Sequence, residues 1–196
     1  MERLCVNGTE YEIIRLLGKG KGGYSYLAKE VGGDGCKGEA VSEDPRKTDA
    51  PVVLKQIHHE PCDYYNFGNK IEAERHDYQR LCAAGIRVPR MLDIDVENER
   101  IVKEFIDGPT VFELVRDLDC GLGEGIFTEV RKMAAFAKNA GLNIDYFPTN
   151  FVLKNELLYY VDYECNPYSD QWNFENWGIK YWWRSPEFLD YVKNHK

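Results

Sequence analysis

The chain has 196 residues, of which 43% are hydrophobic and 30% are charged, and these proportions are ordinary for a globular protein with a sizeable core. Its formal net charge of −8 argues against a protein that coats nucleic acid or binds it directly. No apolar run is long enough to cross a bilayer, so we expect no membrane-spanning segment.

The six cysteines lie far apart, and no two form a Cys-x-x-Cys pair. This spacing indicates reduced thiols and favours neither a disulfide framework nor a zinc site. The first residues also lack the apolar core of a signal peptide, so we expect a cytoplasmic protein. His58, His59 and His76 are interpreted as surface or packing residues.

A glycine cluster near the start of the chain matches the pattern G-x-G-x-x-G through Gly18, Gly20 and Gly23. Dinucleotide-binding folds share this pattern, but there a helix follows the glycines. Here strand-like sequence lies on both sides, so we predict a hairpin. Glycines in a hairpin let backbone N–H groups approach phosphate oxygens, and a plain hairpin turn is the alternative. Residues 32–50 are predicted to form a mobile insertion.

Lys55 interrupts the apolar strand predicted over residues 51–57. A buried lysine needs an anionic partner, because an unpaired buried charge is costly, and the alternative is a lysine on the solvent face of an edge strand. The helix predicted over 69–84 carries Glu74 on or beside its apolar stripe. We expect Lys55 to pair with Glu74, with Glu72 as the rival partner, so that the lysine can hold nucleotide phosphates.

Two further strands, over 91–95 and 101–106, complete a predicted five-stranded antiparallel sheet with one helix. The sequence Asp-Gly-Pro-Thr at 107–110 then interrupts the pattern. This interruption predicts two lobes, residues 1–106 and residues 107–196.

The second lobe is predicted to be small and mostly helical, with helices over 110–118, 126–140 and 186–194. The aromatic residues that are abundant after residue 165 are interpreted as core rather than as a ligand platform. In a two-lobed nucleotide site, backbone groups just before the lobe boundary can bond the edge of adenine. Glu104 and Ile106 are the candidates here.

Polar residues flank a short hairpin in the second lobe. Asp145 and Asn150 lie five residues apart in a loop, and a hairpin predicted over 151–161 returns Asp162 to that loop. In phosphoryl transfer, one carboxylate accepts the proton of the acceptor while Asn and Asp side chains hold magnesium. We therefore predict Asp145 as the base and Asn150 and Asp162 as Mg²⁺ ligands. A polar turn with exposed side chains is the alternative.

The order and spacing of these motifs resemble the protein-kinase-like superfamily over residues 10–165. The pattern is most similar to a small atypical group that includes the RIO kinases, the KEOPS-complex kinase and lipopolysaccharide kinases. The resemblance implies a minimal two-lobed α+β kinase-like fold with ATP and Mg²⁺ as cofactors. It also implies an ATP-dependent phosphotransferase of atypical serine/threonine-kinase type, which transfers phosphate to an alcohol group of a protein or small molecule.

Two motifs depart from the family pattern. Asn143-Ile144-Asp145 replaces His-Arg-Asp or His-Gly-Asp, and Asp162-Tyr163-Glu164 replaces Asp-Phe-Gly. No Ala-Pro-Glu motif follows, and we expect no room for a large peptide-binding lobe. These departures argue against a protein substrate and leave two alternatives open: a pseudokinase or nucleotide-binding scaffold, and an ATPase within a larger assembly.

Overall fold

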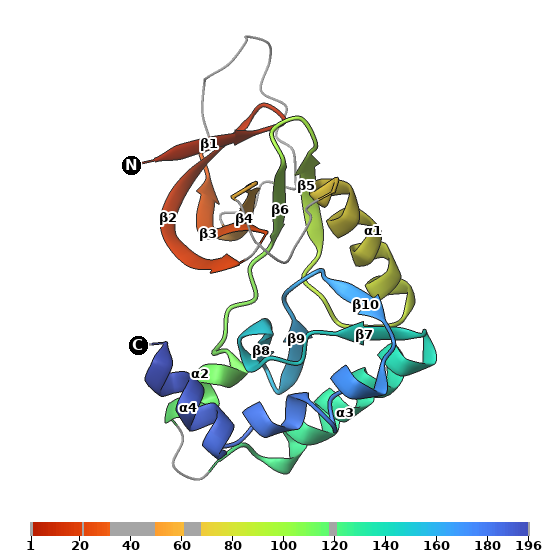
Figure 1. Ribbon diagram of the computed structural model, residues 1–196. Helices are drawn as coiled ribbons and strands as arrows, with labels where there is room; N and C mark the ends of the chain where they lie inside the picture. Colours follow the sequence, from red (N-terminus) through yellow and green to blue (C-terminus); the bar gives the residue numbers. More distant parts are fainter. Residues whose placement is uncertain (1, 21, 32–49, 61–67, 118–120, 196) are drawn as a thin grey trace. The chain divides into compact units, whose positions relative to one another are not determined.

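The computed structural model describes residues 2–20, 22–31, 50–60, 68–117 and 121–195 (Figure 1). The insertion predicted over 32–50 therefore lies almost entirely outside the described residues.

The chain divides into two compact units. Unit 1 comprises Met1–Ala73 and Arg90–Phe105, and unit 2 comprises Glu74–Pro89 and Ile106–Lys196. The second lobe was predicted to begin at residue 107. The main difference is that residues 74–89, which the sequence placed in the first lobe, group with unit 2. This segment contains most of a helix, and sequence periodicity does not show to which unit a helix belongs.

Unit 1 is built on an antiparallel sheet of six strands in the order β1-β2-β3-β4-β6-β5. The strands are β1 (Arg3–Val6), β2 (Thr9–Gly20), β3 (Gly23–Glu30), β4 (Val52–Ile57), β5 (Met91–Asp95) and β6 (Arg100–Glu104). The predicted number of five strands is therefore wrong, and the additional strand is β1. It has only four residues, too few to show a period-two pattern, and it pairs with β2 through a turn at Asn7 and Gly8.

The glycine cluster joins β2 and β3 as a hairpin, which confirms the predicted strand–turn–strand arrangement. Shifts in pairing register between Ile13 and Arg15 and between Leu16 and Gly18 mark irregularities in β2. Such bulges bend a strand and increase its twist, and β2 is strongly curved in Figure 1. Its curvature accompanies a small core that contains Val6, Tyr11, Ala28, Leu54 and Val102.

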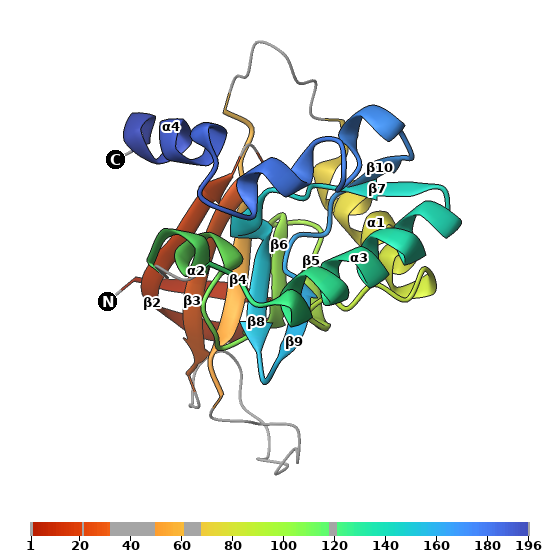
Figure 2. The ribbon, with the colours of Figure 1, turned by 90° about the horizontal axis from the view of Figure 1, so that it is seen from below.

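Unit 2 combines helices with two short two-stranded sheets. Its elements after the shared helix α1 (Lys70–Ala83) are α2 (Val111–Asp117), α3 (Glu124–Asn139), β7 (Leu142–Ile144), β8 (Phe151–Lys154), β9 (Leu157–Tyr160), β10 (Cys165–Pro167) and α4 (Pro186–Asn194). β7 pairs with β10, and β8 pairs with β9. Helix α3 packs against β7 and β9, as Figures 1 and 2 show.

Local contacts mark the ends of three helices in unit 2. Glu113 N–H donates to Thr110 Oγ1 (3.1 Å) while Thr110 N–H donates to a carboxylate oxygen of Glu113 (2.7 Å), which forms a capping box. Phe188 N–H donates to Ser185 Oγ (3.0 Å) at the start of α4. Gly141 follows α3 with φ +69°, a conformation that glycine adopts without strain.

The core of unit 2 is rich in aromatic side chains. Tyr146, Phe151, Tyr160, Phe174 and Trp182 are each at most 1% exposed. This confirms the interpretation of Phe174 and Trp182 as core residues, but two other tryptophans of the same segment lie at the surface. None of the helices within the described ranges has the length and apolar character to cross a membrane. The described cysteines, Cys5, Cys82 and Cys165, are free thiols.

Candidate functional site

Asp145 begins the loop that follows β7, and its side chain is exposed. Phe147 N–H donates to Asp145 Oδ1 (3.0 Å), which orients the carboxylate over the following turn. Asp145 N–H in turn donates to the hydroxyl of Tyr160 (3.3 Å). The carboxylate is therefore held at the start of the loop while remaining accessible to a ligand.

Asn150 closes a short 3-10 helix, Pro148–Asn150, and is tied to both neighbouring segments. Its Nδ2 donates to Asp145 C=O (3.4 Å), and its own C=O accepts from Val161 N–H (2.9 Å). The first bond uses the amide nitrogen of the side chain. The amide oxygen is then the atom that can coordinate a cation.

Asp162 lies two residues after the end of β9 and is partly buried. The hairpin of β8 and β9 confirms the predicted return of the chain, with Asn155 and Glu156 at its turn. Tyr163 N–H donates to Asp162 Oδ1 (2.8 Å), so that the carboxylate is held by its own backbone segment. Asp162 and Asn150 are brought close because Val161 is bonded to Asn150.

Tyr160 connects these segments. Its hydroxyl accepts from Asp145 N–H and donates to Glu164 C=O (2.8 Å). Burial, with the negative charges of Asp162 and Asp145, raises the pKa of Tyr160 well above its ordinary value. The phenol therefore stays protonated and keeps donating to Glu164. Sequence reasoning missed this residue, because the continuous apolar run Leu-Leu-Tyr-Tyr does not show which tyrosine hydroxyl will be buried.

The Tyr160→Phe substitution tests this connection. It removes the two hydrogen bonds that the hydroxyl makes with Asp145 N–H and Glu164 C=O, so we expect the free energy of unfolding to fall by about 1–3 kcal/mol. Urea unfolding measures the change, and Tyr159→Phe, at the partly exposed neighbouring position, is the matched control. Equal losses in the two variants would show that the Tyr160 hydroxyl does not hold the loop.

Asn143 is a second residue whose role was missed. It is 4% exposed in β7, and its Nδ2 donates to Ser169 C=O (3.2 Å). The sequence analysis noted only that Asn143 stands where the kinase pattern has histidine. The structure shows instead that Asn143 itself ties the start of the loop to the segment after β10. The available signal was a polar residue within the apolar sequence Leu-Asn-Ile.

The glycines of the hairpin in unit 1 fall into two kinds. A Cβ added at Gly18 would meet nothing within 4 Å, and one at Gly20 would meet only Gly23 O at 3.9 Å. A Cβ at Gly23 would lie 2.7 Å from the carbonyl oxygen of Gln56 and 3.2 Å from Lys55 Cε. Packing on β4 therefore requires glycine at position 23. Nothing in the surrounding packing requires it at 18 or 20, where the space beside the α-carbon is open.

Alanine substitutions should separate the two kinds of glycine. We expect Gly23→Ala to lower the free energy of unfolding by about 1–3 kcal/mol, because the new methyl group clashes with backbone. Gly18→Ala, the matched control, should leave stability within about 0.5 kcal/mol or raise it slightly by restricting the unfolded chain. Thermal unfolding of both variants checks the expectation, and a Gly18→Ala loss as large as that of Gly23→Ala would contradict it.

Lys55 lies in β4 between Ser25 of β3 and Ile101 of β6. Because β4 is an internal strand, the alternative of a lysine on an edge strand is wrong. The side chain is partly buried and passes beside Gly23. Unit 1 thus brings the glycine hairpin and Lys55 together.

The predicted ion pair of Lys55 with Glu74 joins residues of different units and stays a prediction. Glu74 is 9% exposed on α1, whereas the rival Glu72 is less buried. At the predicted adenine contact, Glu104 N–H already donates to Arg90 C=O (2.9 Å). This N–H group is therefore already used within unit 1, and the adenine contact stays a prediction.

Within the described ranges, no three or more His, Cys, Asp or Glu side chains form a group that could hold a metal ion. The predicted Mg²⁺ ligands, Asn150 and Asp162, are one amide and one carboxylate and do not make such a group. They still suit magnesium, which proteins usually bind through one or two side chains together with substrate phosphates and water. The sequence matches no protein-family model, and a search of curated proteins found no match.

Proposed function

We propose that this protein is an ATP-dependent phosphotransferase of atypical kinase type, with a minimal two-lobed kinase-like fold and an alcohol group as acceptor. The observation that carries the proposal is a set of hydrogen bonds in unit 2. Asn150 bonds both Asp145 C=O and Val161 N–H, which precedes Asp162. Asp145 N–H also donates to the hydroxyl of Tyr160. Two carboxylates and an amide oxygen are thereby held within one small region by backbone and phenol contacts. That is the donor set which phosphoryl transfer requires.

Each residue has a separate role in the proposal. Asp162 and Asn150 would hold Mg²⁺, whose charge offsets that of the nucleotide phosphates. Asp145, which is exposed, orients the acceptor hydroxyl and takes up its proton. Since its Oδ1 accepts from Phe147 N–H, the carboxylate keeps a fixed direction during this transfer.

In the proposal, residues of unit 1 bind the phosphates and the adenine of the nucleotide. Backbone groups of the glycine hairpin would bind the phosphates, because the space beside the α-carbon is open at Gly18 and Gly20. Lys55, directed by Glu74 in the proposal, contacts the same phosphates. Glu104 and Ile106 supply the backbone groups for adenine.

The test is the loss of the γ-phosphate of Mg·ATP in the wild type, in Lys55→Ala and in Asp162→Ala. We expect turnover in the wild type and a large loss in both variants. Equal turnover in all three would reject the proposal. Release of inorganic phosphate without any acceptor would favour the ATPase alternative over transfer to an alcohol.

A nucleotide-binding scaffold is the second candidate function. It is favoured by the position of Glu164, which replaces a flexible glycine of the kinase motif and is followed directly by β10. Asn166 Nδ2 donates to its carboxylate (3.3 Å), which restrains this segment further. A rise in melting temperature with Mg·ATP, but no turnover, would select the scaffold.

A further inference from the structure

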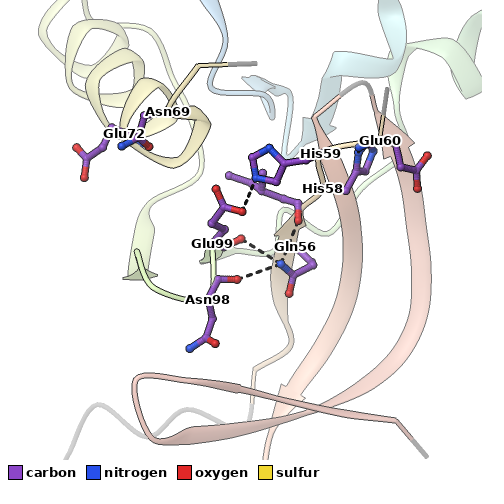
Figure 3. A network of polar contacts seen from close by, with 9 residues as sticks. Gln56, His58, His59, Glu60, Asn69, Glu72, Asn98 and Glu99 are labelled. Atoms are coloured by element: carbon purple, nitrogen blue, oxygen red, sulfur yellow. Dashed lines mark hydrogen bonds and ion pairs between the residues drawn. The ribbon is translucent and has the colours of Figure 1, made fainter. Parts of the chain in front are cut away.

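The segment that leaves β4 forms a polar clasp on the glycine hairpin, made by His58 and Glu60. His58 Nε2 bonds Gly20 C=O (3.1 Å), and His58 N–H donates to Gly22 C=O (3.4 Å). In Figure 3, His58 lies beside Glu60 where the chain emerges from the strand. The histidine therefore contacts the backbone on both sides of the turn.

The bonds of His58 define its protonation. A carbonyl oxygen only accepts, so the bond to Gly20 requires a hydrogen on Nε2. Glu60 N–H donates to Nδ1 (3.3 Å), which must then be unprotonated. The neutral Nε2–H form of His58 satisfies both partners at once, and it links residue 60 to the turn through one ring.

Glu60 extends the clasp to both strands of the hairpin. Its carboxylate accepts from Lys19 Nζ (2.7 Å) on β2 and from the hydroxyl of Tyr24 on β3. Lys19 and Tyr24 are cross-strand neighbours, so one carboxylate joins the two strands. The bond to Glu60, followed by that to Tyr24, raises the pKa of Lys19 to about 12. The ammonium group therefore stays charged at neutral pH.

On the β2 side, the hairpin tip has little apolar packing. Residues 14–20 of β2 are all exposed, and glycines at 18 and 20 bring no side chain. The end of β4, from which this segment leaves, is held by a further bond. Gln56 Nε2 donates to Asn98 C=O (3.0 Å) in the turn before β6 (Figure 3). The segment that carries His58 and Glu60 is thus anchored to the turn before β6.

We propose that His58, supported by Glu60, is a positioning residue that holds the glycine turn where its backbone amides receive nucleotide phosphates. This inference rests on the proposed function of the hairpin. Holding the turn before the nucleotide arrives removes an ordering cost from binding. The clasp should therefore act on the binding of Mg·ATP rather than on the phosphoryl transfer step.

His58→Leu tests the inference. The variant loses both ring bonds, so we expect the KM for Mg·ATP to rise about five- to tenfold while kcat changes less than about threefold. Amide hydrogen exchange in the peptides of residues 14–28, measured without nucleotide, should become faster. His58→Gln should restore much of the wild-type KM, because its side-chain amide can donate to Gly20 C=O in place of Nε2.

His59→Leu is the matched control. His59 follows His58 directly, but its Nε2 bonds a carboxylate oxygen of Glu99 (2.6 Å) and not the hairpin, as Figure 3 shows. We expect its KM and hairpin exchange to match the wild type.

The outcomes separate the two proposals. An active wild type in which His58→Leu changes neither KM nor hairpin exchange overturns the clasp alone. A KM increase of the same size in His59→Leu also overturns it. A wild type that neither binds nor turns over Mg·ATP overturns the proposed function, and the positioning role falls with it.

Discussion

Asp162→Asn is expected to reduce the turnover of Mg·ATP at least about a hundredfold. The substitution keeps the size of the side chain and an oxygen that can accept from Tyr163 N–H, but it removes the negative charge that binds magnesium. The variant should still fold, so that the loss of turnover is not explained by unfolding. The two measurements are the rate of γ-phosphate loss and the urea midpoint, made on the same preparations.

Glu156→Gln provides the control for this experiment. Glu156 lies at the exposed turn of the same hairpin and loses the same charge on substitution. Its turnover should equal that of the wild type. If Asp162→Asn retains full turnover, or if Glu156→Gln loses as much, Asp162 is not the magnesium ligand.

Trp182→Ala is expected to lower the free energy of unfolding by about 3–5 kcal/mol. The side chain is fully buried, and its ring centroid lies 5.0 Å from that of Phe151 and 5.2 Å from that of Phe174. Its Nε1 also donates to Tyr146 C=O (2.7 Å), next to Asp145. The substitution therefore removes core packing and a support of the candidate catalytic loop together.

Two further variants separate the contribution of core packing from that of the Nε1 hydrogen bond. Trp182→Phe keeps most of the buried ring but leaves Tyr146 C=O without its donor, so we expect a smaller loss of about 1–3 kcal/mol. Trp183→Ala changes the adjacent tryptophan, which is 52% exposed, and should cost no more than about 0.5 kcal/mol. Denaturant unfolding of all three variants gives the comparison. Similar losses in Trp182→Ala and Trp183→Ala would contradict the assignment of Trp182 to the core.

Local signals explain why the sequence predicted the helices and hairpins well. Thr110, Ser185 and Gly141 mark helix ends through contacts or conformations that involve only nearby residues. Strand β1 was missed because its four residues show no period, and it is stabilised by pairing with β2. The internal position of β4, between β3 and β6, likewise depends on pairing with strands that lie far away in sequence.

The sequence predicted the part of the candidate site whose geometry depends on a short stretch of chain. A tight hairpin between Asn150 and Asp162 brings these residues together, and its turn is visible in the sequence. The contributions of Tyr160 and Asn143 depend on which polar atoms the tertiary fold buries, which local patterns do not reveal. His58 was interpreted as a surface or packing histidine, because no sequence pattern links it to Gly20.

The most direct test of the proposed phosphotransferase is a crystal structure of the full chain with Mg²⁺ and a non-hydrolysable ATP analogue. We predict a magnesium ion coordinated by Asp162 and Asn150 at about 2.1 Å, with the phosphates against Lys55 and the backbone of the glycine hairpin. A bound nucleotide whose metal contacts neither Asp162 nor Asn150, or whose phosphates lie away from Lys55, would contradict it.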